Sequence, residues 1–298
     1  MADREHLLTT LEMARFVARG FLRFDAIVPA ALNERFLEEV ESGLPPFAPA
    51  GTPLARCYEG SAVAEIVRLP RVEGVIESLV GPNPRFDHQG VHFNPPASVF
   101  EAQGHRVLAQ HTHQDSTIDP RTAFDLQLMY FPHEVTPEMA GTRFIPGTHL
   151  RVVSEMACAR YQNVVGQQKV VCPAGTILAL HHGIWHGGEV NRSDRTRFML
   201  KLRLAPTVRQ CRLWNTDDLG PEMSAPQPIF DPTRMFDPDP KDVQSILCRP
   251  EPWFELDTGR LEFINRIRLW RHLLGDEDFD AHHWMTRLEN VPPGVERI

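Results

Sequence analysis

The chain has 298 residues, and its 42% hydrophobic and 23% charged content predicts a globular protein with a sizeable core. A net charge of −8 without any basic stretch argues against a nucleic-acid-binding protein. No apolar run reaches the length of a membrane span, and the N-terminal MADREHLL has no secretory apolar region. We therefore expect a cytoplasmic protein that makes no use of a membrane. The five cysteines are scattered without a C-x-x-C pair, which indicates neither a disulfide framework nor a thiolate metal site.

The first 84 residues are predicted to be mainly helical. Thr9 and Glu12 have the spacing of a capping box at the start of a helix, and Gly20 is suited to end it. A proline at position 29 fits the first turn of a second helix. The predicted elements are helices over 9–20, 29–43 and 70–80 and a short strand over 21–28.

From residue 86 the pattern changes to short β-forming runs separated by proline and glycine. The predicted strands cover 86–93, 106–113, 123–131, 142–145, 169–171, 175–181 and 196–205. Short strands with little helix between them predict a sandwich or a jelly roll rather than alternating βαβ units. The absence of a G-x-G-x-x-G or Walker-type loop argues against the usual nucleotide-binding folds. After a loop rich in proline and aspartate, residues 261–274 predict an amphipathic helix, with Leu261 on its apolar side and Arg266 on its polar side.

The stretch HTHQDS, residues 111–116, carries candidate metal ligands. In a strand, His111, His113 and Asp115 share one face, and the Cα atoms of the last two lie roughly 6.6 Å apart. Both side chains then reach one metal ion. The alternative is a polar edge strand with ordinary surface histidines.

A third ligand is expected from the segment HHGIWHGG, residues 181–188. The apolar strand before it delivers His181, His182 and His186 to its far end. His186 completes a facial triad of two histidines and one carboxylate, which suits non-haem Fe(II) and leaves three coordination positions open. We expect His181 and His182 to pack in the core or to orient the ligand histidines.

Arg197 lies 11 residues beyond His186, in the predicted strand 196–205. Alternation places its side chain on the face opposite Leu200 and Leu202. A guanidinium inside a barrel binds a carboxylate in bidentate fashion, so an organic diacid is its expected partner.

Taken together, these motifs resemble the phytanoyl-CoA dioxygenase family of Fe(II)/2-oxoglutarate oxygenases. The resemblance rests on HQD at 113–115, PGTH at 146–149, H-x4-N-x-S-x3-R at 186–197 and the N-terminal stretch 11–40. It spans most of residues 9–206, and the segment 207–298 has no counterpart. One departure is Gly188, where many relatives carry a small hydroxyl residue that contacts the co-substrate.

The resemblance implies a mainly β protein with flanking helices around a double-stranded β-helix, the cupin-like jelly roll. It makes His113, Asp115 and His186 the iron ligands and Arg197 the residue that holds the distal carboxylate of 2-oxoglutarate. Further candidate contacts to the co-substrate are Gln114, Gln127 and His111; a satisfied core amide and a pocket-lining histidine are the alternatives for the last two. We expect one catalytic domain over 1–298, with a helical N-terminal region (1–84), a jelly-roll core (85–206) and a C-terminal extension (207–298). This extension and the loop 44–53 are candidate lids.

The implied reaction is a hydroxylation, or another oxidation, of a small molecule with O2 and 2-oxoglutarate, releasing succinate and CO2. Asp115 is the carboxylate that related halogenases lack, so its presence favours oxidation over halogenation. The acidic chain has no obvious cluster for nucleotide phosphates, which favours a free metabolite over an acyl-CoA ester. We expect a monomer or homodimer. The alternatives are a cupin-like metalloprotein that does not use 2-oxoglutarate and an inert ligand-binding relative.

Overall fold

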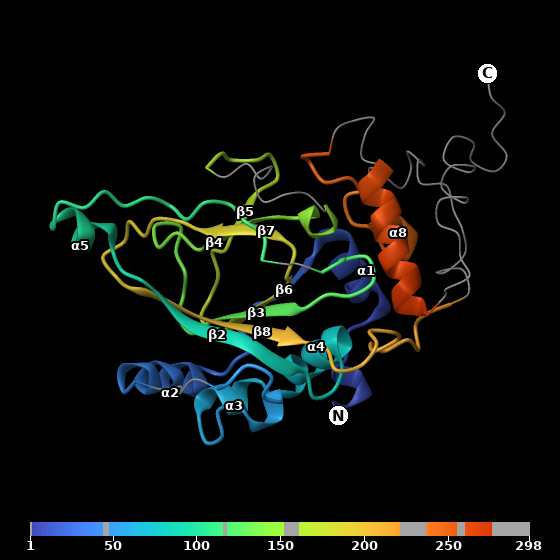
Figure 1. Cartoon of the computed structure of the whole chain (residues 1–298), viewed down its shortest axis with the longest axis horizontal. Helices are drawn as coiled ribbons and strands as arrows, with labels where there is room; N and C mark the ends of the chain where they lie inside the picture. The colour runs from blue at the N-terminus through green and yellow to red at the C-terminus, as the bar shows by residue number, and fades with distance from the viewer. Residues whose placement is uncertain are drawn as a thin grey trace.

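Two antiparallel sheets lie one above the other in the computed structural model of the protein (Figure 1), which describes residues 2–43, 48–115, 118–151, 161–220, 237–254 and 260–275. The larger sheet has the strand order β1-β6-β3-β8-β2, and the smaller has the order β5-β4-β7. The strands are β1 (Phe21–Phe24), β2 (Arg85–Asn94), β3 (Leu126–Phe131), β4 (Thr142–Ile145), β5 (Gln168–Lys169), β6 (Thr176–His181), β7 (Trp185–Gly188) and β8 (Arg197–Ala205). The expected class, a mainly β protein with a jelly-roll core and flanking helices, is confirmed.

Helices cover the outer face of the larger sheet and one end of the molecule (Figure 1). The helices are α1 (Thr10–Arg19), α2 (Ala30–Glu41), α3 (Ala62–Ile66), α4 (Pro70–Val80), α5 (Ala97–Glu101), α7 (Val243–Cys248) and α8 (Arg260–Leu274), with short 3-10 turns η1 (Arg4–His6), η2 (Leu54–Arg56) and η3 (Thr148–Leu150). Most of the buried apolar side chains form one core between these helices and the sheet. A second, smaller core fills part of the space between the two sheets and includes Met129, Phe144 and Met199.

Strand β8 shows how this layering follows from alternation along a strand. Leu200, Leu202 and Leu204 are buried in the core beneath the helices. The residues between them therefore point to the other face, toward the smaller sheet. Arg197 and Lys201 lie on this inner face, as the alternation in the sequence predicts.

The N-terminal helix begins and ends where its local sequence predicts. Thr9 and Glu12 form the capping box, and Gly20 closes the helix in the left-handed conformation with φ = 77°. Gly20 is also required by space, because a Cβ atom there would lie 2.5 Å from Nδ1 of His149. The helix can therefore pack directly on the turn that follows β4.

Two expectations about secondary structure are wrong. Residues 106–113 do not form a strand, because they pair with the rest of the sheet only through an isolated bridge at His113 and a hydrogen bond at Gln110. The segment that carries His186 forms a short strand, β7, which pairs with β4. Helix α8 also departs from the expected pattern at two positions, since Leu261 is 58% exposed while Arg266 is buried. Arg266 is accommodated because it donates hydrogen bonds to the carbonyls of Leu247 and Arg249.

Some segments of the candidate lids fall outside the described residues. These segments are residues 44–47 of the proline-rich loop and residues 221–236, 255–259 and 276–298 of the C-terminal extension. The histidine pair at 282–283 belongs to them.

Candidate metal centre

Two chain segments, far apart in the sequence, bring three potential metal ligands together. His113 and Asp115 lie on the extended segment before β3, and His186 lies on β7. The backbones of His113 and His186 form a two-way bridge in which each N–H donates to the other carbonyl at 2.9 Å. This bridge places the two imidazole rings side by side, with their centroids 4.5 Å apart.

The geometry of the three side chains fits a single metal ion. Nε2 of His113 lies 3.5 Å from Oδ1 of Asp115, and Nε2 of His186 lies 3.5 Å from its Oδ2. Two ligand atoms that are each about 2.1 Å from one ion, at right angles, lie about 3 Å apart. The three groups therefore need only small movements to hold an ion. Two histidines and one carboxylate are the ligand set of the facial triad.

Hydrogen bonds fix the ring orientation and the tautomer of both histidines. Nδ1 of His113 lies 3.0 Å from the carbonyl of His111, and Nδ1 of His186 lies 3.0 Å from the carbonyl of Ile184. Because a carbonyl only accepts, each Nδ1 must carry the proton and each Nε2 has a free lone pair. Burial lowers the pKa of His186 to about 4, so this imidazole is neutral and ready to coordinate at pH 7.

Asp115 is ionised at neutral pH. Burial opposes the negative charge, but His186 in its protonated form and Lys201 favour it and lower the pKa of the carboxyl group well below its ordinary value. Lys201 donates a hydrogen bond to Oδ2 at 2.9 Å. The centre thus offers two imidazole nitrogens and one anionic oxygen, a donor set that suits a divalent ion.

Arg197 is a buried cation with no acidic partner among the described residues. Its side chain lies on the inner face of β8, and the residue is 4% exposed. Nη1 donates to the carbonyl of Ala140, while Nε is buried without a partner. Burial lowers its pKa to about 10, which still leaves the guanidinium charged at pH 7. Burial of a cation without a counter-ion is costly, so this position suits an anionic ligand.

The remaining predicted contacts surround the same region. Gln127 on β3 is fully buried, and neither its amide oxygen nor its amide nitrogen has a partner. The ring of His111 packs against that of His113, with centroids 5.4 Å apart, and Gln114 is half-buried between two ligand residues. Contacts of these three side chains with a co-substrate stay predictions.

The PGTH turn, residues 146–149, holds the backbone next to His186 in place. The hydroxyl of Thr148 donates to the carbonyl of Ile145 at 2.7 Å and accepts the N–H of Trp185 at 3.0 Å. This pair of bonds ties the end of β4 to the start of β7, one residue before His186. Trp185 packs with Ile145 in a small apolar cluster.

Sequence reasoning missed two polar side chains near the triad, Arg143 and Lys201, and it did not predict that the buried ring of His182 would lack hydrogen-bond partners. Arg143 is buried and donates to the carbonyls of Gln110 and Gly188, which lie on the two segments that carry the ligands. Nothing in the local sequence around Arg143 signals this. Lys201 was accessible to prediction, because the alternation that placed Arg197 on the inner face of β8 places Lys201 there as well.

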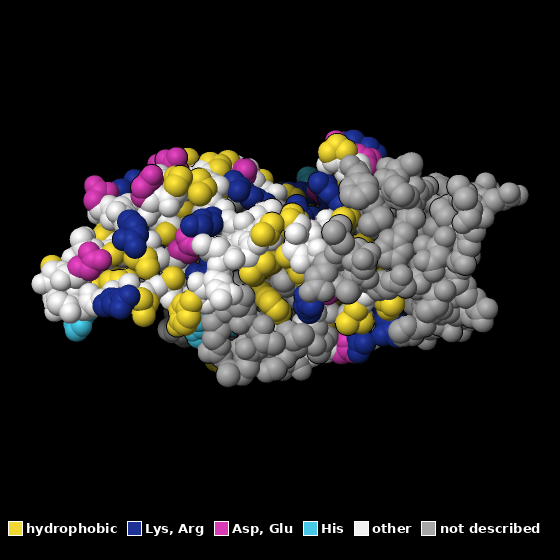
Figure 2. Space-filling view, turned by 90° about the horizontal axis from the view of Figure 1, so that it is seen from above, with side chains coloured by type: hydrophobic (Ala, Val, Ile, Leu, Met, Phe, Trp, Pro, Cys, Tyr) yellow, Lys and Arg dark blue, Asp and Glu magenta, His cyan; other side chains and the backbone are white. Residues whose placement is uncertain are grey.

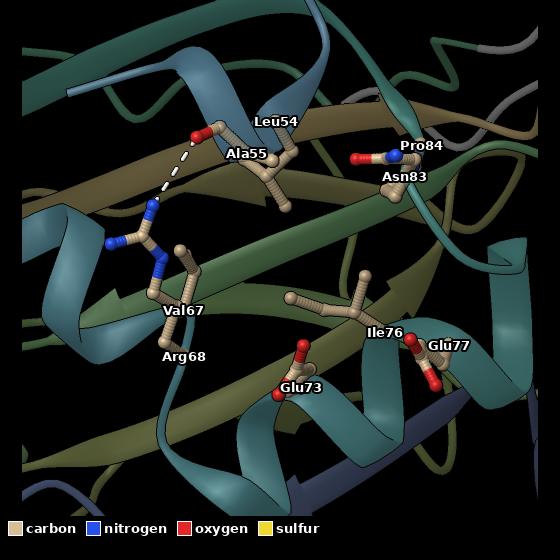
Figure 3. A pocket seen from close by; sticks show the side chains of 9 residues that line it. All are labelled: Leu54, Ala55, Val67, Arg68, Glu73, Ile76, Glu77, Asn83 and Pro84. Carbon is tan, nitrogen blue, oxygen red and sulfur yellow. Dashed lines mark hydrogen bonds between the residues drawn. The ribbon is translucent and has the colours of Figure 1, made fainter. Parts of the chain in front are cut away.

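A cavity near α4 is not an alternative active site. It lies between η2, α3 and α4 and is lined by Leu54, Ala55, Val67, Arg68, Glu73, Ile76, Glu77, Asn83 and Pro84 (Figure 3). Its volume of about 90 Å³ is small beside the roughly 300–1,000 Å³ of most ligand sites. No member of the triad lines it.

Surface charge gives no sign of a polyanionic partner on the face above the smaller sheet. Basic, acidic and hydrophobic side chains are mixed there within the described residues, and neither charge gathers into a patch (Figure 2). No helix in the described segments of the chain is long and apolar enough to cross a lipid bilayer.

The fold agrees with that of one solved structure. The carbocyclase SnoK from nogalamycin biosynthesis, described as non-heme and alpha-ketoglutarate dependent, is 16% identical with a TM-score of 0.52, covering 74% of this chain and 92% of SnoK. HygX from Streptomyces hygroscopicus, solved with nickel and 2-oxoglutarate, is 17% identical with a TM-score of 0.49, covering 67% and 88% of the two chains. No curated protein sequence matches. Residues 20–199, more than half of the chain, match the family described as "Phytanoyl-CoA dioxygenase (PhyH)", and the chain therefore belongs to that family.

Proposed function

We propose that this protein is an Fe(II)- and 2-oxoglutarate-dependent oxygenase that oxidises a small molecule and releases succinate and CO2. The observation that carries the proposal is the combination of the triad with Arg197, a buried cation that has no acidic partner in the described structure. A metal centre alone would fit many metalloproteins. The additional unpaired guanidinium indicates an organic anion that binds beside the metal, and membership of the family favours 2-oxoglutarate.

In this proposal His113, Asp115 and His186 hold the iron, and Arg197 binds the distal carboxylate of 2-oxoglutarate. The bound iron and co-substrate supply the oxidising chemistry with O2. The protein contributes a facial ligand set that leaves coordination positions open on one side. Hydrogen bonds from the ligand histidines to backbone carbonyls keep both Nε2 atoms aimed at the ion.

The presence of Asp115 supports oxidation rather than halogenation, since its carboxylate fills a position that a halide would otherwise need. We propose a hydroxylation as the outcome, while the family and the fold support the broader class of 2-oxoglutarate-dependent oxidation. The cupin-like alternative without a co-substrate leaves the burial of Arg197 unexplained.

The test is Fe(II)-dependent conversion of 2-oxoglutarate into succinate, measured with the purified protein in air. We expect succinate formation that needs added Fe(II), and no activity in Asp115→Ala or His186→Ala. Asp119→Ala serves as a matched control, because Asp119 is an exposed aspartate near the centre in sequence and its side chain forms an ion pair with the nearby Arg121. Retained turnover in both ligand variants would refute the proposal.

A further inference from the structure

A lysine that contacts Asp115 lies directly beside the proposed metal site, and it has so far been given no role in binding a ligand. Lys201 is on the inner face of β8, its side chain is 12% exposed, and its Nζ lies 2.9 Å from Oδ2 of Asp115. The chain has three lysines in all. The side chains of the other two, Lys169 and Lys241, are each more than half exposed, and each lysine forms an ion pair.

Lys201 and Arg197 form two separate positive positions on the same strand face. They are four residues apart on β8, so their Cα atoms lie roughly 13 Å from each other along the strand. Arg197 has no acid beside it among the described residues, whereas Lys201 contacts the carboxylate of the triad. One anion bound at Arg197 therefore leaves the position at Lys201 available to another.

Metal binding at the triad would change the surroundings of Lys201. Oδ2 of Asp115 faces both Nε2 of His186, at 3.5 Å, and Nζ of Lys201, at 2.9 Å. A divalent ion held by the triad would draw on this same carboxylate and would repel the ammonium group. The ammonium group of Lys201 would then need another acceptor, which a ligand carboxylate could supply.

The nearby cation Arg203 does not supply a positive charge to a ligand, because it already has its own partners. It lies on the inner face of β8 and contacts Asp125 at 2.6 Å and Asp87 at 3.1 Å. Lys201 differs from Arg203 because the acid that it contacts is a proposed metal ligand.

Two neutral polar side chains next to Lys201 are buried without hydrogen-bond partners. Both ring nitrogens of His182 and both amide atoms of Gln127 lack a partner, and both residues are fully buried. Burial and the charge of Arg203 lower the pKa of His182 to about 3, so the ring is neutral. Gln127 is paired in register with Arg203, two positions beyond Lys201 and away from Arg197. Each unpartnered group costs about 1–3 kcal/mol, which a polar ligand would recover.

We propose that the substrate carries a carboxylate that Lys201 binds beside the metal, while His182 and Gln127 contact its neutral polar groups. This inference rests on the proposed function and adds the substrate class to it. It also assigns Gln127 to the substrate rather than to the distal end of the co-substrate. An acidic metabolite is the expected substrate, and a purely apolar one is excluded.

The test uses chemical labelling of lysines in the unaltered protein, loaded with Mn(II) and 2-oxoglutarate under anaerobic conditions so that no turnover occurs. The probes are three acids, benzoate, phenylacetate and hexanoate, each compared with its primary amide. Sulfosuccinimidyl acetate modifies exposed amines, and mass spectrometry reports the rate at each lysine. Because the chain has three lysines, Lys169 and Lys241 serve as internal controls.

We expect at least one acid to slow the labelling of Lys201 about tenfold at saturation, consistent with a charged hydrogen bond, while its amide has no effect. Labelling of the two control lysines should not change. Lys201→Gln should remove the preference for the acid over the amide in equilibrium binding, and Lys169→Gln should keep it. The labelling result does not depend on whether the Lys201 variant folds.

The outcomes separate this inference from the proposed function. Failure of Mn(II) or 2-oxoglutarate to bind would contradict the proposed function itself. Normal binding of both, with no acid protecting Lys201, would overturn only the substrate class. Protection of Lys201 by 2-oxoglutarate alone would also overturn it, because that result would assign the lysine to the co-substrate.

Discussion

The two faces of strand β8 differ in how completely their side chains are satisfied. On the outer face, Leu200 and Leu202 are buried among apolar neighbours beneath the helices. On the inner face, Arg197 is buried with an unpartnered Nε, and Lys201 shares its carboxylate with a proposed metal site. The outer face of β8 therefore stabilises the fold, while polar groups on its inner face are not fully paired within the described residues. Stability and ligand binding should respond to different substitutions on one strand.

The largest expected effect on stability comes from the outer face. Leu202→Ala removes a side chain that is 1% exposed and leaves a cavity, so we expect the free energy of unfolding to fall by about 2–5 kcal/mol. Denaturant unfolding measures this change, and Mn(II) affinity of the folded variant should match that of the unaltered protein. Weakened metal binding without a loss of stability would break the distinction between the two faces.

The inner face should show the opposite response. Arg197→Met removes the proposed anchor for 2-oxoglutarate, so its affinity should fall at least about tenfold, the value of a charged hydrogen bond. Calorimetry on the Mn(II)-loaded protein measures this. Unfolding should need no less denaturant, because the variant no longer buries a cation that lacks an acidic partner among the described residues. Arg195→Met, at an exposed arginine two residues earlier, is the control.

Three buried histidines, His149, His181 and His182, predict how stability depends on pH. Burial lowers the pKa of His149 and His182 to about 3, and the pKa of His181 is shifted in the same direction by burial. In the unfolded chain each of these histidines takes up a proton below its ordinary pKa near 6.5. In the folded chain the buried rings stay neutral until the pH is much lower. Stability is therefore fully present above pH 6.5 and falls on acidification toward pH 3, by up to about 1.4 kcal/mol per pH unit for each histidine. Constant unfolding free energy between pH 7 and pH 5 would contradict this.

The smallest effect is expected at the start of α1, far from the inner face. Thr9→Ala removes the side chain that accepts the N–H of Glu12, and loss of such a cap costs about 1 kcal/mol. Thermal unfolding measures the change against Thr207→Ala, an exposed threonine outside a helix cap. An equal loss in both variants would show that the cap has no special role. Binding of 2-oxoglutarate should be unaffected in either.

The features that sequence predicted well are those determined by neighbouring residues. The cap at Thr9, the turn at Gly20 and the alternation that turns Arg197 inward all depend on a few adjacent positions. The motif around His113 and Asp115 also indicated that both side chains could bind one metal ion, although the segment is extended rather than part of a sheet. A strand needs partners along its length, and residues 106–113 have none beyond isolated contacts.

The features that sequence did not predict depend on distant regions of the chain. Arg266 is buried because carbonyls of α7 and the residue after it accept its hydrogen bonds, which no pattern within α8 can signal. Strand β7 is four residues long and ends in two glycines, so its pairing with β4 is specified by the fold. Lys201 was overlooked although the same alternation places it on the same strand face as Arg197, since its partner Asp115 is 86 residues away.

The most direct test of the account is a calorimetric titration of Mn(II) into the protein, followed by 2-oxoglutarate. We predict one metal site per chain, loss of that site in Asp115→Ala, and binding of 2-oxoglutarate only after the metal and only with Arg197 intact. Equal metal binding by Asp115→Ala, or metal-independent binding of 2-oxoglutarate to Arg197→Met, would contradict it.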